Sequence, residues 1–305
     1  MIVALPDSVK KREVDLVLLL VAFFWGSSYL AAKVLTEHTP VLSVLGLRFA
    51  VTSIGMLVVW LFRRDTFQKA EWILGSILGA SQAFILFCET AGVSKTTATN
   101  AGLIISLTIV MTPILESIAA KNWLPRGFFI AAVVAVVGVA LLVSGEGFSA
   151  PGLGDWLMLV AALIRSIHVT AMGHVTRGRS YSTVNMTLVQ SLTCGVIFSL
   201  LSYQDMSEAV SHFAPAQWYG LLYLSLLCGL FSFLANLWAI RRTSASRAGL
   251  LLATEPIWAV VVGITVGGET LATLGVIGAL LILGSTFWGQ RIETMHREKA
   301  LAVNL

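Results

Sequence analysis

The chain has 305 residues, of which 57% are hydrophobic and 12% charged, with a mean hydropathy of +0.86. A soluble protein would carry about a quarter charged residues, so the composition excludes an ordinary soluble domain. The net charge of +4 does not point to nucleic acid, and the three cysteines offer neither a disulfide framework nor metal-ligand spacing. We therefore expect no cofactor, no metal and no nucleic-acid partner.

Long stretches without charge dominate the sequence. Between Lys95 and Glu116 lie 20 uncharged residues, and between Glu208 and Arg241 lie 32. About 20 apolar residues let a helix cross the hydrocarbon core of a bilayer. The segments lack the strict alternation of a membrane β-barrel. The sequence predicts an all-α polytopic membrane protein.

Ten spans can be counted in chain order. The first follows Lys10, Lys11 and Arg12 and is longer than the apolar part of a usual signal peptide, so we interpret it as an uncleaved helix. The predicted limits are 15–35, 41–62, 72–94, 97–118, 126–144, 154–176, 182–203, 216–240, 247–268 and 270–290.

The cations between the spans predict the orientation. With the N-terminus in the cytosol, 16 of the 20 Lys and Arg residues fall on the cytosolic side. Only Lys33 and Lys95 fall outside, while Arg48 and Arg165 lie within spans. Positive charge is retained on the cytosolic side of membrane proteins. We expect both termini in the cytosol, and the bacterial inner membrane as the location.

The fourth and ninth spans begin alike. Residues 97–113 read TATNAGLIISLTIVMTP and residues 244–256 read SASRAGLLLATEP, with the AGL triplets 147 positions apart and the prolines 143 apart. We interpret the prolines as matching, with one extra helical turn in one copy. The sequence then divides into a tail (1–14), two five-helix repeats (15–146 and 147–290) and a second tail (291–305). An odd number of spans inverts the second repeat, as in many secondary transporters.

Several motifs together resemble one family. They are FFWGSSYLAAK (23–33), LRFA (47–50), the paired AGL openings and ATEPIWAVVVGITVGGE (253–269). In this order, with ten spans and the repeat, nearly the whole chain resembles the EamA-type members of the drug/metabolite transporter superfamily. The resemblance implies a secondary transporter, often an exporter of amino acids or related metabolites, with the aromatic amino acid exporters as one candidate subgroup.

Four charged residues lie inside the predicted spans and are candidates for substrate binding. Charges in the membrane usually face a cavity or a partner. From the helical rise, Arg165 and Glu255 lie at one depth, and Arg48 and Glu89 nearer the outer face. We hypothesise that Arg165 pairs with Glu255, and Arg48 with Glu89.

Further candidates are aromatic or polar. Trp25 and Tyr29 share a face of the first span, and Glu255 and Trp258 share a face of the ninth, where an acid beside an aromatic ring suits an ammonium group or an aromatic substrate. His168 could relay protons, bind substrate or simply pack with a hydrogen bond. Packing is also the alternative for each aromatic residue. Gln82 and Asn100 are further candidates for the site, and either could instead bridge helices.

Pro256 directly follows Glu255 and should kink the ninth span by freeing the carbonyl of Leu252. Pro113 is the expected counterpart in the fourth span, without an acid beside it. We predict that the prolines serve as hinges or shape the helices, and that Glu255 serves chemistry or polarity. The alternative is a protonated Glu255 that is bonded within the kink.

Three functional classes can be weighed. A secondary transporter working by alternating access around a central site is favoured, since the sequence has no P-loop for ATP. An intramembrane enzyme would need a nucleophile, paired acids or metal ligands at working spacing, which are not found. A channel-like facilitator usually needs an oligomeric ring of like groups. Proton coupling stays open, and we expect a monomer or weak dimer that takes a small-molecule substrate within a lipid bilayer.

Overall fold

The computed structural model describes residues 7–120, 123–144, 151–176, 179–240, 242 and 245–303, and these ranges contain helices and no strands. The helices are α1 (Asp7–Thr36), α2 (Val41–Arg63), α3 (Lys69–Val93), α4 (Ala98–Ile105), α5 (Thr108–Ala120), α6 (Arg126–Val143), α7 (Leu153–Thr176), α8 (Thr183–His212), α9 (Pro215–Leu222), η1 (Tyr223–Phe231), α10 (Ser232–Ile240), α11 (Ala245–Leu252), α12 (Glu255–Thr265) and α13 (Thr273–Val303).

Polar residues at the predicted loops begin several of these helices. The Thr97 side chain accepts a hydrogen bond from the Asn100 backbone at the start of α4, and Ser182 does the same for Asn185 at the start of α8. Glu71 closes a capping box at the start of α3. Such caps satisfy the first N–H groups of a helix, which have no partner within the helix itself.

Nine helical segments among the described residues are long and apolar enough to cross a membrane. The predicted ninth span, 247–268, instead contains the two shorter helices α11 and α12. Large apolar side chains are exposed along the bundle, as on α6, where Val133 and Val136 are more than 60% exposed. Contiguous exposed apolar surface of this extent suits lipid, and the chain is a multi-pass membrane protein.

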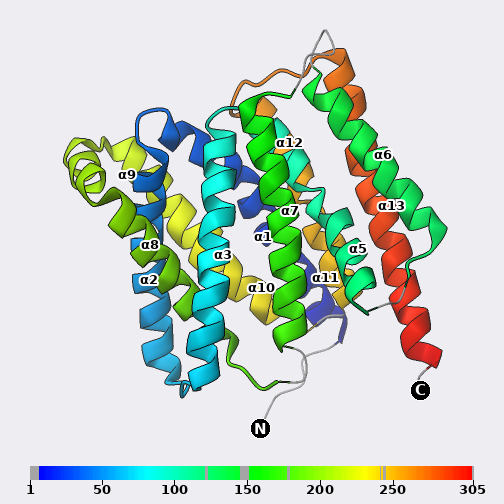
Figure 1. The fold of residues 1–305 in the computed structure, drawn as a ribbon, viewed down its shortest axis with the longest axis horizontal. Helices are drawn as coiled ribbons and strands as arrows, with labels where there is room; N and C mark the ends of the chain where they lie inside the picture. The colour runs from blue at the N-terminus through cyan, green and yellow to red at the C-terminus, as the bar shows by residue number, and fades with distance from the viewer. Residues whose placement is uncertain are drawn as a thin grey trace.

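The helices form a bundle in which α6 and α13 pair at one side (Figure 1). α2 packs on α8, α3 packs on α7 and α8, and α1 packs on α12. Glycines allow the close approach of α3 to α8, because a Cβ on Gly75 or Gly79 would meet Val189 or Thr193. The Gly75/Gly79 pair therefore serves helix packing within the chain.

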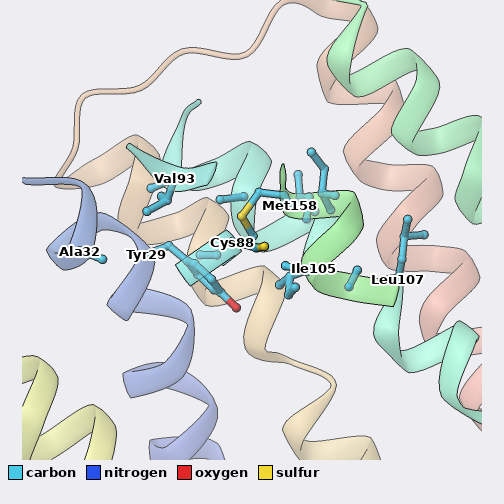
Figure 2. Packing of buried hydrophobic residues seen from close by; sticks show 14 of the residues in the cluster. Tyr29, Ala32, Cys88, Val93, Ile105, Leu107 and Met158 are labelled. Carbon is cyan, nitrogen blue, oxygen red and sulfur yellow. The ribbon is translucent and has the colours of Figure 1, made fainter. Parts of the chain in front are cut away.

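The largest buried apolar cluster surrounds α4. It joins Tyr29 of α1, Cys88 of α3, Ile105 of α4 and Met158 of α7, as Figure 2 shows. A Cβ on Gly102 of α4 would meet Ala259 of α12 and the ring of Tyr29, so these helices approach closely. The first turns of the fourth span therefore lie at the centre of the molecule, against α1 and α12.

The fourth and ninth spans are both interrupted, and the interruptions share one register. α4 ends at Ile105 and α5 begins at Thr108; α11 ends at Leu252 and α12 begins at Glu255. Each of these positions differs from its counterpart by 147, the offset of the AGL triplets. The hydrogen bonds agree, since Leu107 N–H donates to the Ile104 carbonyl at 3.1 Å and Thr254 N–H to the Leu251 carbonyl at 3.2 Å.

Our matching of the prolines was therefore wrong. Pro256 lies in the first turn of α12, where a missing N–H costs nothing, whereas Pro113 lies inside α5. Relative to the shared break, Pro113 stands four positions further along than Pro256. The ninth span is also broken before Pro256 and not kinked at it, so the interruption recurs without a proline at a fixed place.

The eighth span contains a different irregularity, because η1 is a π-helix of nine residues between α9 and α10. Three hydrogen bonds join it to α1: Trp25 Nε1 donates to the Cys228 carbonyl at 3.2 Å, the Cys228 thiol donates to the Phe24 carbonyl at 3.2 Å, and the Ser27 and Tyr223 hydroxyls lie 2.5 Å apart. π-helical turns are rare and are frequent at functional sites. This one faces the helix that carries Tyr29.

Candidate functional site

Tyr29 and Glu255 meet between α1 and α12. The phenol of Tyr29 donates a hydrogen bond to Glu255 Oε1 at 2.8 Å. Tyr29 is buried, and Glu255 lies in the first turn of α12, where the helix dipole favours a carboxylate. The break before Glu255 places this carboxylate at a helix start within the predicted span.

A second polar contact joins α7 to α3. Arg165 Nη1 donates to Glu89 Oε1 at 3.2 Å, and the Glu89 side chain is only 12% exposed. Our predicted pairs, Arg165 with Glu255 and Arg48 with Glu89, were wrong. Depth along a straight helix does not give the direction in which a side chain points, and α3 packs directly on α7.

The two contacts belong to one electrostatic network. Arg165 also interacts with Tyr29 and Glu255. Glu89 and Tyr29 are among the electrostatic neighbours of Arg48 of α2, although neither forms a hydrogen bond or ion pair with it. Five of the predicted site residues thus come together, from α1, α2, α3, α7 and α12, where the sequence suggested two separate levels.

The two deep tryptophans point to different neighbours. The Trp25 indole bonds to η1, as described above. Trp258 makes an edge contact with Phe23, with ring centroids 5.4 Å apart, and its buried indole N–H has no partner among the described residues. The Trp25 indole N–H is therefore bonded to η1, while the Trp258 indole N–H remains an unused donor among the described residues.

The remaining polar candidates lie beside the network. His168 is buried on α7, and its Nδ1 lies 2.7 Å from the Ser81 hydroxyl of α3. This bond fits the packing alternative for His168. Gln82 on α3 and Asn100 on α4 are half-buried, and no hydrogen bond among the described residues joins either side chain to the network.

A carboxylate clasp that we did not predict lies at the other end of α12. Glu269 accepts hydrogen bonds from Ala98 N–H at 2.7 Å and Thr99 N–H at 2.8 Å, at the start of α4, and from Lys33 Nζ of α1 at 3.1 Å. Burial opposes ionisation, but the bonds from Thr99, Ala98 and Lys33 lower the pKa of Glu269 below its usual value. The signal was available, since Lys33 and Glu269 are opposite charges at the same predicted membrane face.

A polar pocket of about 440 Å³ lies apart from the network, between the α2–α3 connection and the start of α8. Buried Glu71 lines this pocket. Its carboxylate accepts hydrogen bonds from Ser182 N–H at 2.6 Å and from Asn185 Nδ2 at 2.9 Å. Because the carboxylate is fully used in joining the two segments, we assign it to the fold. Among the described residues, no three His, Cys, Asp or Glu side chains are grouped to hold a metal ion.

Comparison with known proteins bears on this arrangement. The family described as "EamA-like transporter family" matches the chain twice, over residues 13–144 and 152–288. An uncharacterized transporter of Archaeoglobus fulgidus is 28% identical over 283 residues, covering 91% of this chain and 85% of that protein.

Two further relatives agree with this match. The uncharacterized inner membrane transporter YedA of Escherichia coli is 23% identical to this chain. The alignment covers 85% of this chain and 86% of YedA. A solved crystal structure superposes with a TM-score of 0.59 at 16% identity, over 91% of this chain and 96% of that one. That likeness concerns the fold alone.

Proposed function

Because the chain belongs to the EamA-like transporter family, we propose that it is a secondary transporter that exports amino acids or related small zwitterions. Export and the amino-acid class rest on the sequence resemblance and on the mixed charge of the network. A phosphate carrier would instead present several unopposed cations to its cavity. Aromatic amino acids are the first subgroup to test.

The proposed architecture has ten spans in two inverted five-helix repeats, with α11 and α12 together forming the ninth span. Its support is the double match to one family and the shared register of the two breaks. The 16-to-2 distribution of cations supports cytosolic termini, and the description of YedA supports an inner membrane.

The observation that carries the proposal is that both halves contribute to one polar network. Tyr29 and Glu89 come from the first half, and Arg165 and Glu255 from the second. Substrate sites of transporters with inverted repeats lie at the repeat interface near the midplane, often at broken helices. Glu255 begins a helix directly after such a break.

Alternating access would then move the two halves about this network. The breaks at 106–107 and 253–254 are where the fourth and ninth spans can bend without losing long runs of backbone hydrogen bonds. The proposed central residues would bind substrate in both states, with Trp258 and its free indole N–H at the edge of the site.

Proteoliposomes provide the test. The purified protein is reconstituted, loaded with the twenty amino acids in turn, and followed for release with and without a pH gradient. We expect saturable release from wild type and its loss in Glu255→Gln. Glu37→Gln is the control, because Glu37 is exposed at the end of α1. Linear, unsaturable release would favour a channel-like facilitator, and no release of any amino acid would refute the substrate class.

A further inference from the structure

Arg48 differs from the other charged members of the network. Arg165 is paired with Glu89, and Glu255 accepts from Tyr29. The guanidinium of Arg48 makes no hydrogen bond or ion pair with any described residue, although the residue is half-buried in the middle of α2. The guanidinium carbon of Arg48 lies 5.9 Å from the ring centroid of the adjacent Phe49.

The electrostatic neighbours of Arg48 include two thiols and an acid. The thiols of Cys228 on η1 and Cys194 on α8 are among its electrostatic neighbours, as is Glu89. One turn further along α2, Thr52 Oγ1 donates to the Ser225 carbonyl of η1 at 3.3 Å. Arg48 therefore lies where α2 packs on the π-helix, beside the network.

An unpaired cation in such surroundings is unfavourable, and a ligand can supply the missing partner. Guanidinium offers five N–H donors in a planar fork that matches the two oxygens of a carboxylate. We propose that Arg48 binds the carboxylate of the transported substrate, which makes it the residue that selects carboxylate-bearing substrates. This inference rests on the proposed function and narrows its substrate class.

Arg165 is less suited to binding the substrate carboxylate, because it already forms an ion pair with Glu89 at 3.2 Å. Glu89 and Glu255 also lie within the network, so a dianion such as a phosphate monoester would be repelled there. A zwitterion avoids this conflict, because its ammonium group can face the acids while its carboxylate faces Arg48. The charges of the network and of an amino acid are then complementary.

The test compares each amino acid with its own amide, which keeps the side chain and ammonium group but lacks the carboxylate. Release from proteoliposomes is measured for both compounds. For each variant, the kcat/KM for the amino acid is then divided by the kcat/KM for its amide. That ratio does not depend on how much protein is correctly folded. We expect wild type to favour the acid at least tenfold and Arg48→Gln to lose that preference, with amide transport retained.

Arg48→Lys should keep part of the preference, since a lysine binds a carboxylate as a point charge without the fork. If Arg48→Gln yields no folded protein, the ratio in Arg48→Lys decides. Arg126→Gln is the matched control, because Arg126 is an exposed arginine at the start of α6. It should leave the ratio at the wild-type value.

Other outcomes refute the inference in distinguishable ways. Equal transport of acid and amide by wild type would overturn the role of Arg48 and leave the carrier intact. An Arg48→Gln variant that slows acid and amide equally would show a structural role only. Failure of wild type to transport any member of the panel would overturn the proposed function, and this inference with it.

Discussion

The phenol of Tyr29 and the carboxylate of Glu255 are joined by a 2.8 Å hydrogen bond, although 226 positions separate them in the sequence. The bond connects the first span to the first turn of α12, directly after the break in the ninth span. It links the two halves of the chain through a single pair of atoms. When the halves move, this bond must persist, break, or be replaced by a bond to the substrate.

Removing the Tyr29 hydroxyl should therefore impair transport. A hydrogen bond to a charged group contributes about 1.5–3 kcal/mol, so Tyr29→Phe should slow saturable release by between about 10- and 100-fold. The measurement is the initial rate in proteoliposomes. Tyr219→Phe, an exposed tyrosine of α9, should be unaffected. Wild-type rates in Tyr29→Phe would show that the bond has no part in transport.

The Arg165–Glu89 pair can be tested by exchanging its charges. Arg165→Glu and Glu89→Arg should each lower transport at least about tenfold, because each leaves two like charges close together. The double exchange should recover a measurable part, since it restores opposite charges on α3 and α7. Arg165→Glu combined with Glu255→Arg should recover less, because the structure gives that pair no direct bond. Equal recovery by both doubles would contradict the assigned pairing.

The limits of most predicted spans lie close to helix ends because charges and capping residues mark them, although α8 continues to His212 and α13 to Val303. The AGL triplets give the offset of 147 that relates the two breaks, but this offset does not place a break in either span, and the two prolines indicated another register. The pairing of the charged side chains within the membrane could not be predicted from the sequence. Each residue turns a helix by about 100°, so a small unknown rotation moves a charge from one neighbour to another. Only packing, such as α3 against α7, decides which acid faces Arg165.

The glycine at position 26 should tolerate no side chain. A Cβ there would lie 2.5 Å from the Glu255 carbonyl and 2.8 Å from Trp258 Cβ, so α1 would be pushed from α12. Gly26→Ala should cost about 1–3 kcal/mol of stability, the usual effect of overpacking, and lower transport with it. Thermal unfolding in detergent measures the loss.

Gly173 on α7 offers the control for this substitution, because a Cβ there meets nothing within 4 Å. Gly173→Ala should be neutral or slightly stabilising, since alanine is the better helix former. If both variants unfold at the wild-type temperature, α1 and α12 are not held as closely as the structure shows.

The Glu269 clasp predicts a pH dependence with a definite sign. Hydrogen bonds from the Thr99 and Ala98 backbones and from Lys33 outweigh burial and hold the pKa of Glu269 below its usual value. A carboxyl with a lowered pKa in the folded state stabilises the fold above its ordinary pKa, about 4.3, and loses that contribution as the pH falls through the lowered value. Glu269→Gln should therefore unfold at a lower temperature than wild type at pH 7.

The gap between the two unfolding temperatures should narrow as the solution is acidified below about pH 4, because both proteins then carry a neutral side chain at this position. Lys33→Met should reproduce only part of the pH 7 effect, since the two backbone N–H bonds to Glu269 remain. Glu37→Gln, an exposed acid near the same end of α1, should match wild type throughout. A gap that stays constant from pH 7 to pH 3 would mean that the geometry of residue 269, and not its charge, holds α1, α4 and the α12–α13 connection together.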